Sequence, residues 1–181
     1  MPDTTERVLL LISERRIRAR IATLARRIDA DYRGRTLCLV VVLKGAFVFA
    51  ADLARQLATP STTDFISASS YGTGTRSSGK VALGGTDALQ LDGKHVLVVA
   101  DILDTGRTGA AILDVLHRQG PASLALCTLL RKPAAGALDL AADYVGFDIG
   151  HDFVVGYGMD YAERHRNLRA IYRLIPGGPA G

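Results

Sequence analysis

A polar turn that carries carboxylate and hydroxyl side chains follows an apolar run in the middle of the chain. The segment is VLVVADILDTGRTG over residues 96–109, and its polar part includes Asp104, Thr105, Gly106 and Thr108. Backbone N–H groups at the start of a helix are unpaired and carry positive potential, and glycine lets an anion approach them closely. The turn could therefore hold a phosphate monoester, although an Asp or Thr here could equally serve only as a helix cap.

A lysine stands at the end of a second apolar run. Residues 37–43 are LCLVVVL, and Lys44-Gly45 follows directly. A lysine at the end of a buried strand is costly unless its amine reaches solvent or an anion. Lys44 is therefore a candidate anion ligand, and the alternative is a lysine in an ordinary strand-to-helix turn.

The segment SYGTGTRSSGK, residues 70–80, has no apolar periodicity. It holds three glycines, several hydroxyl residues and a single aromatic residue, Tyr71. Strand-like sequence lies on both sides, so we expect a mobile loop rather than a linker between domains. On composition alone, a plain surface loop is the simpler interpretation.

The elements that must position these residues alternate between strands and helices. Apolar runs predict strands, and apolar residues at helical spacing predict helices. The predicted strands are residues 8–12, 37–43, 64–69, 95–101 and 124–130, and the predicted helices are residues 14–32, 47–57 and 105–119. This alternation is typical of an α/β fold with a mainly parallel sheet, whose ligands bind beyond the carboxyl ends of the strands.

Composition limits the classes of protein to which the chain can belong. At 181 residues, with 48% hydrophobic and 22% charged residues, one globular domain is expected and disorder is not. The two cysteines, Cys38 and Cys127, lie in apolar runs and should be buried thiols. The most apolar stretch, residues 37–51, is too short to span a membrane, and the N-terminus resembles no signal or transit peptide. We expect a cytoplasmic protein.

Seven arginines lie between Arg7 and Arg27 in a chain of formal net charge +4. Such a cluster can bind phosphates or nucleic acid. Apolar residues at helical spacing between them, from Ile17 to Ile28, place most of the arginines on the opposite face of a helix. A solvated helix face is the favoured interpretation.

The polar turn after residue 100 resembles the loop of type I phosphoribosyltransferases that binds phosphoribosyl pyrophosphate (PRPP), because an apolar strand and acidic residues precede D-T-G-x-T. Three further segments are similar to the hypoxanthine-guanine branch of that family. They are VLKGAFVFAADL (42–53), SSYGTGTRSSGKV (69–81), and LLRKP followed by DYVGFDIGHDFVVGYGMDYAERHRNL (143–168). The resemblance covers most of the chain, from Val42 to Leu168.

This resemblance implies Mg²⁺-dependent transfer of phosphoribosyl from PRPP to N9 of a 6-oxopurine, giving IMP or GMP and pyrophosphate. It implies the type I phosphoribosyltransferase fold as one domain over residues 1–181. The core is expected over about 34–142, with a small hood from about 1–13 and 143–176. It also implies a homodimer or homotetramer, and neither a nucleic-acid partner nor a membrane is required.

The same resemblance assigns residues to PRPP and magnesium. The 5′-phosphate would be bound by the turn Asp104, Thr105, Gly106, Arg107 and Thr108. Pyrophosphate would be bound by Lys44, Gly45 and Arg166. Ser70 and Tyr71 would belong to a loop that closes over the site. Two magnesium ions are implied, one near Asp101, which also faces the ribose hydroxyls, and one near Asp160.

The remaining roles concern the base. Asp104 would accept a proton near purine N7, and Lys132 would donate to the 6-oxo group. Phe153 would stack on the ring, while backbone groups around Val154 would contact its edge, and Asp160 lies on the same side. Taken singly, Lys132 could be a surface turn residue, Phe153 a core residue and Asp160 a turn acid.

The chain departs from the family pattern in three places. Ala100 stands where a Glu normally precedes Asp101, and Gly150-His151 replaces a common Pro-Asp. Met159 stands where Leu or Ile is frequent. The lost carboxylate at position 100 predicts weaker PRPP binding and leaves open a catalytically weakened nucleotide-binding member of the fold. An RNA-binding pyrimidine-type regulator is a second alternative, which the arginine-rich helix would suit.

Overall fold

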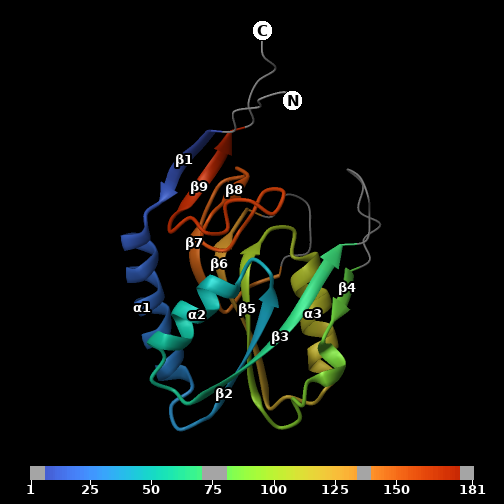
Figure 1. The fold of residues 1–181 in the computed structure, drawn as a ribbon. Coiled ribbons are helices and arrows are strands. Elements are labelled where there is room, and N and C mark those ends of the chain that lie inside the picture. The colour runs from blue at the N-terminus through green and yellow to red at the C-terminus, as the bar shows by residue number, and fades with distance from the viewer. Residues whose placement is uncertain (1–6, 71–80, 134–139, 176–181) are drawn as a thin grey trace.

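A computed structural model describes residues 7–70, 81–133 and 140–175 of the chain. Its main feature is a six-stranded sheet in the order β4-β3-β2-β5-β6-β7 (Figure 1). The strands are β2 (Leu37–Leu43), β3 (Ser61–Ser70), β4 (Val81–Gly84), β5 (His95–Leu103), β6 (Ser123–Arg131) and β7 (Tyr144–Asp148). Every pairing is parallel except β3 with β4. The expected mainly parallel sheet is confirmed.

A second, three-stranded sheet lies above the carboxyl ends of the core strands (Figure 1). It is antiparallel and consists of β1 (Arg7–Ile12), β9 (Ile171–Ile175) and β8 (Val154–Val155). This sheet is the expected hood. Residues 143–176 were assigned to it from the sequence, but β7 pairs with β6, so that assignment is wrong for β7. Short strands in the C-terminal region carry no signal of which sheet they join.

Helices cover both faces of the core sheet. Helices α1 (Glu14–Asp31) and α2 (Phe47–Gln56) pack on one face, and α3 (Arg107–His117) packs on the other (Figure 1). The residues of β2 alternate between the two apolar layers, with Leu39 and Val41 in one and Val40 and Val42 in the other. A strand covered on both faces must be apolar throughout, which explains the continuous run at 37–43.

Two element boundaries near the polar turn differ from the prediction. Strand β5 continues to Leu103, so Asp101 lies inside the strand. Helix α3 begins at Arg107 rather than at residue 105, because Gly106 precedes it in the left-handed region at φ 76°. That conformation is readily adopted only by glycine, so the helix cannot extend backward through it. A short 3-10 helix, η1 (Thr86–Ala88), follows β4.

The arginines of α1 are exposed, as expected for a solvated helix face, but three of them also contact β7. Arg20 donates from Nε to the Gly146 carbonyl at 2.6 Å and from Nη2 to the Val145 carbonyl at 2.9 Å. The guanidinium of Arg16 lies 5.9 Å from the Phe147 ring centroid, and Arg27 lies similarly over Tyr144. These arginines fasten α1 to β7, which is an edge strand.

Both cysteines are buried free thiols, as expected. Burial raises the pKa of Cys38 and of Cys127, so neither thiol is activated as a nucleophile. Among the residues that the structure describes, no helix is long and apolar enough to cross a membrane.

Candidate active site

A cavity of about 680 Å³ lies between the carboxyl ends of the core strands and the hood. Twelve of the residues singled out from the sequence line it: Lys44, Gly45, Asp101, Asp104, Thr105, Gly106, Thr108, Lys132, Phe153, Val154, Asp160 and Arg166. They come from β2, β5, β6, β8, α3 and the segments that follow these strands. The parallel topology brings them together because strand carboxyl ends share one edge of the sheet.

One residue expected at this site stands apart from it. Arg107 is exposed at the start of α3 and does not line the cavity. Ser70 ends β3, but its side chain lies outside the part of the structure that is described. Tyr71 lies outside the described residues, so the expected closing loop stays a prediction.

The turn at 104–108 presents free backbone donors to the cavity. Gly106 precedes the helix with φ 76°, and no side chain caps α3. The interpretation of Asp104 or Thr105 as a helix cap is therefore wrong. The first N–H groups of α3 lack intrahelical partners, and with Thr105 and Thr108 beside them they form a site suited to an oxyanion.

Gly45 packs directly against Asp101. A Cβ built at Gly45 would collide with the Asp101 carboxylate, and one built at Gly158 would collide with the Gly45 carbonyl. The Leu43–Lys44 peptide bond is cis. Three backbone segments thus meet at the floor of the cavity, and glycine at position 45 is what lets the Asp101 carboxylate lie there.

Burial raises the pKa of Asp101, and the charge of Asp160 acts in the same direction. The backbone N–H of Ile102, which donates to Asp101 Oδ1 at 2.9 Å, and the charge of Arg166 oppose the rise. A buried carboxylate close to a second one is costly to ionise without a cation. The pair therefore provides hard oxygen ligands at a place where a positive charge would stabilise both.

Two cations and two carboxylates form a connected network across the cavity. Lys44 Nζ lies 3.1 Å from Glu163 Oε1, and Arg166 Nη2 lies 3.3 Å from Glu163 Oε2. Arg166 Nη2 also lies 2.8 Å from Asp160 Oδ1, and its Nη1 donates to the Gly158 carbonyl at 2.9 Å. The amine of Lys44, at the end of β2, therefore reaches solvent and a counter-ion, so its charge is not buried without a partner.

Glu163 was missed from the sequence. It lies in the segment DYAERHR between Asp160 and Arg166, where its only signal was a charge alternating with its neighbours. Hydrogen bonds from Lys44, followed by those from Arg166, lower the pKa of Glu163. It is therefore a carboxylate at neutral pH.

A second cation–carboxylate pair also lines the cavity. Lys132 Nζ is 3.7 Å from Asp104 Oδ2, and the Lys132 side chain is only 12% exposed. The interpretation of Lys132 as a surface turn residue is therefore wrong. A cationic donor and a carboxylate acceptor at this separation can contact two adjacent atoms of one ring system.

Phe153 also lines the cavity, and its ring is exposed. It is 52% exposed, which excludes the core interpretation. Its only ring neighbour among the described residues is Tyr161, edge-on at a centroid distance of 5.7 Å and an interplanar angle of 83°. One face is thus open for stacking on a planar ligand. Val154 is buried in β8, and Met159 lines the cavity with 5% exposure.

Residues 12–162 match the model of the phosphoribosyl transferase domain family. The chain belongs to this family. It is 43% identical over 169 residues to the hypoxanthine phosphoribosyltransferase of Haemophilus influenzae, covering 92% of this chain and 94% of that one. It is 45% identical over 173 residues to the hypoxanthine-guanine phosphoribosyltransferase of Mycobacterium avium, covering 92% and 85%.

A solved structure is also similar to this phosphoribosyl transferase domain. It is a hypoxanthine-guanine phosphoribosyltransferase from Bacillus anthracis, with a TM-score of 0.87 at 42% identity, covering 94% of this chain and 99% of that chain. The fold and family expected from the sequence motifs are confirmed. The relatives named here are transferases, which favours an enzyme over a non-catalytic or regulatory protein.

Ala100, the departure from the pattern of phosphoribosyltransferases, is partly exposed at the cleft end of β5. It packs against the same apolar cluster as Ala68, a residue that lines the cavity. Position 100 is thus close to the cavity without contributing to its lining. His151 is exposed and does not line the cavity.

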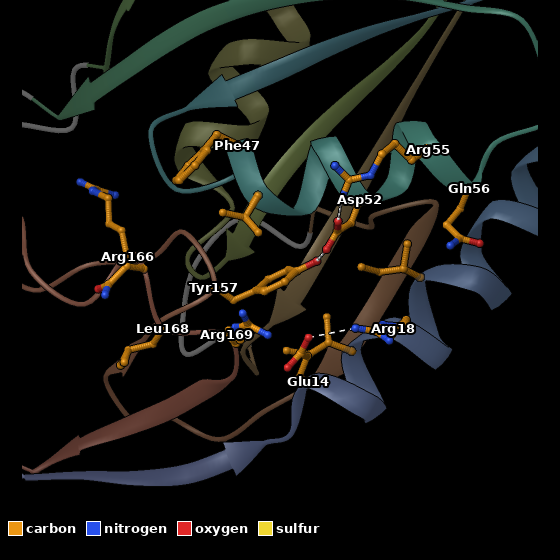
Figure 2. Close-up of a pocket in the computed structure, with 14 residues that line it drawn as sticks. Glu14, Arg18, Phe47, Asp52, Arg55, Gln56, Tyr157, Arg166, Leu168 and Arg169 are labelled. Carbon is orange, nitrogen blue, oxygen red and sulfur yellow. Dashed lines mark hydrogen bonds and ion pairs between the residues drawn. The ribbon is translucent and has the colours of Figure 1, made fainter.

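A second cavity, of about 600 Å³, lies next to the first in this phosphoribosyl transferase domain, between α1, α2 and residues 157–169 (Figure 2). Tyr157 and Asp52 point toward each other at its centre, and the tyrosine hydroxyl donates to the carboxylate. Burial and then this carboxylate raise the pKa of Tyr157, so it remains a neutral donor. Arg55 also pairs with Asp52, and Arg166 lines both cavities.

Proposed function

We propose that this chain transfers the 5-phosphoribosyl group of PRPP to N9 of a 6-oxopurine, hypoxanthine or guanine, and releases IMP or GMP with pyrophosphate. The observation that carries the proposal is the pair formed by Lys132 and Asp104, 3.7 Å apart, which lines the same cavity as the exposed Phe153 ring. The names of the relatives support the same reaction.

The pair fits the edge of a 6-oxopurine that carries O6 and N7. The Lys132 ammonium can only donate, so it suits the 6-oxo acceptor, while the Asp104 carboxylate suits an N7 proton. Adenine would present its amino group to the ammonium, donor against donor, and would be disfavoured. Phe153 would stack on the ring, and backbone groups around Val154 would contact its other edge.

The PRPP part of the proposal uses the remaining lining residues. The turn Asp104–Thr108 would hold the 5′-phosphate through its free N–H groups and threonine hydroxyls. Lys44, Gly45 and Arg166 would hold pyrophosphate, and Asp101 would face the ribose hydroxyls. Arg107 is not needed in this arrangement except through its backbone N–H.

The carboxylates of Asp101 and Asp160 fit Mg²⁺. The described residues hold no cluster of three or more acidic, His or Cys ligands, but Mg²⁺ is usually held by one or two carboxylates together with substrate phosphates. Burial raises the pKa of Asp101, so a bound cation would favour its ionised form. Bound Mg²⁺, one ion at each aspartate, would neutralise phosphate charge as pyrophosphate leaves.

The chain's own residues then do three things. Lys44 and Arg166 stabilise the charge that accumulates on pyrophosphate as its bond to C1′ of the ribose breaks. Phe153 and Lys132 hold the base so that N9 can form the new bond to C1′ from the opposite face. Asp104 accepts the N7 proton, which leaves a neutral purine in the nucleotide.

Three further features are proposed by analogy. Ser70 and Tyr71 would close over the site and exclude water, which would otherwise compete for the cationic ribose. The chain would act as a homodimer or homotetramer in the cytoplasm. It would need no nucleic acid.

The experiment is an assay of nucleotide formation from PRPP, MgCl₂ and each of hypoxanthine, guanine, xanthine, adenine and uracil. We expect product from the 6-oxopurines and none from adenine or uracil. Lys132→Met should lower kcat/KM for hypoxanthine by about 100-fold, as expected for a lost charged contact of 2–3 kcal/mol. Product from uracil, or from no base at all with folded protein, would contradict the proposal.

A further inference from the structure

Glu163 occupies the space between the two cations assigned to pyrophosphate. Its Oε1 and Oε2 lie 3.1 and 3.3 Å from Lys44 Nζ, and Oε2 lies 3.3 Å from Arg166 Nη2. Arg166 is also paired with Asp160 at 2.8 Å. Two positive and two negative groups thus balance each other, and pyrophosphate that binds Lys44 and Arg166 would compete with the Glu163 carboxylate for them.

The backbone around Glu163 is built to hold this position. Ala162, Glu163 and His165 have φ values of 50°, 62° and 75°, a region that residues with side chains rarely adopt. The Asp160 carboxylate accepts from the Glu163 N–H at 2.9 Å, and Tyr161 and Arg164 exchange backbone hydrogen bonds across the turn. Three unfavourable conformations in four residues are retained when the surrounding contacts require them.

The contacts of Glu163 are also easily exchanged. The side chains of Lys44 and Glu163 are each 67% exposed, and ion pairs at such exposure contribute little to stability. A carboxylate presents two oxygens to a lysine and an arginine as a phosphate group does. An anion of higher charge would therefore displace it.

We propose that Glu163 is a competing carboxylate, which neutralises Lys44 and Arg166 while the pyrophosphate subsite is empty and which pyrophosphate must displace to bind. This inference rests on the proposed function, because it takes Lys44 and Arg166 as the pyrophosphate ligands. By competing for the same cations, Glu163 weakens the binding of PRPP and pyrophosphate and favours the release of the latter.

The test is the affinity of the whole protein for inorganic pyrophosphate in MgCl₂, measured by titration calorimetry for the native chain and Glu163→Gln. Glutamine keeps the shape of the side chain and removes its charge. Since two exposed pairs are weakened, we expect Kd for pyrophosphate to fall about threefold to tenfold. The KM for PRPP should fall in parallel, the KM for hypoxanthine should stay the same, and kcat should not rise.

Two controls separate competition from other effects. Asp114→Asn removes one charge from an exposed pair with Arg118 on α3, and it should leave pyrophosphate binding unchanged. In a Lys44→Met background, Glu163→Gln should tighten pyrophosphate binding less than in the native chain. The affinity for GMP, which leaves the pyrophosphate subsite empty, should change less than about twofold.

Unchanged or weaker pyrophosphate binding in Glu163→Gln would overturn the proposal, and weaker binding would mean that Glu163 positions Lys44 for the ligand. Failure of the proposed function gives a different result. In that case the native chain would bind no pyrophosphate and form no nucleotide, whereas a wrong role for Glu163 leaves both intact.

Discussion

The Asp101 carboxylate lies where a side chain at residue 45 would have to lie, so Gly45 has a function in the site beyond its flexibility. We expect Gly45→Ala to rotate that carboxylate out of place and to lower kcat on the order of 100-fold, as misplacement by about 1 Å can do. The free energy of unfolding should change little, because the carboxylate can turn toward the open cavity. Steady-state kinetics and urea unfolding would measure the two effects.

Gly150→Ala is the matched control, because a Cβ there meets only Asp152 at 4.0 Å. It should change kcat less than about twofold, within the range of ordinary surface substitutions. If Gly45→Ala retained native kcat, the close approach of Gly45 to Asp101 would have no part in catalysis.

One substitution, Ala100→Glu, would restore the carboxylate that the family pattern has at position 100. Ala100 is partly exposed and directly precedes Asp101, which lines the cavity. We expect Ala100→Glu to place a carboxylate near the ribose hydroxyls and to lower the KM for PRPP about threefold to tenfold, the effect of one added charged hydrogen bond. Ala100→Gln should have a smaller effect, and an unchanged KM in both would place residue 100 out of reach of the ribose.

At the level of secondary-structure elements, the apolar runs and their periodicity predicted the long strands and the helices. The bounds of the short strands and their pairing partners depend on tertiary contacts and were not predicted. The apolar runs at 37–43, 95–101 and 124–130 are strands of the parallel sheet, since a strand covered on both faces has to be apolar. Strand-like sequence was expected after residue 80, but β4 was given no bounds because its four residues are too few to show alternation. Strand β7 was assigned to the hood because nothing in its five residues indicates its partner.

The candidate site was predictable to the extent that its residues follow strands in an order shared with a known family. Lys44, Asp104 and Lys132 could be named because each comes at or just after the carboxyl end of an apolar strand. Glu163 could not, because its role depends on a turn with positive φ values that brings it to Lys44, 119 residues away in sequence. No local pattern encodes that approach.

The arginines of α1 give a prediction at this scale. Arg20 donates two hydrogen bonds to the carbonyls of Val145 and Gly146 in β7, and Gly146 is buried. We expect Arg20→Met, which keeps the aliphatic stem, to lower the free energy of unfolding by about 1–2 kcal/mol because it removes charged donors from these carbonyls. Urea unfolding followed by circular dichroism would measure it.

Arg15→Met controls for the loss of charge, since Arg15 is an exposed residue of the same helix. It should cost less than about 0.5 kcal/mol, as surface substitutions usually do. Equal losses in both variants would mean that α1 is not fastened to β7 through Arg20. Nucleotide formation should be unaffected by either change, because neither residue lines the cavity.

At the scale of the whole molecule, the cavity forms where the core sheet meets the hood region. The core sheet supplies the phosphate turn and Lys132, and the hood region supplies Phe153, Asp160 and Arg166. Strands β1 and β9 lie near opposite ends of the chain and pair with each other, so the hood joins segments that the whole core separates in sequence (Figure 1). The stability of the site is therefore tied to that of the whole domain.

That stability should depend on pH through carboxylates whose pKa is lowered in the folded state. Burial acts to raise the pKa of Asp29, but the N–H groups of Thr59 and Ala58, which donate to its carboxylate at 2.8–3.1 Å, outweigh burial and lower it. A group with a lowered folded-state pKa stabilises the protein above its unfolded pKa of about 3.9 and stops doing so as the pH falls through the folded-state pKa. The stability from Asp29 is therefore present at pH 7 and lost in acid.

We expect Asp29→Asn to reduce the free energy of unfolding by about 1–2 kcal/mol at pH 7, because the amide accepts more weakly from the N–H groups of Ala58 and Thr59, which precede β3. The deficit should shrink as the pH falls below about 4, where the native carboxylate also becomes neutral. Urea unfolding of both chains at pH 7, 5 and 3.5 would measure it, with Asp114→Asn as a control for charge. A deficit independent of pH would show that Asp29 acts through the shape of its side chain and not through its charge.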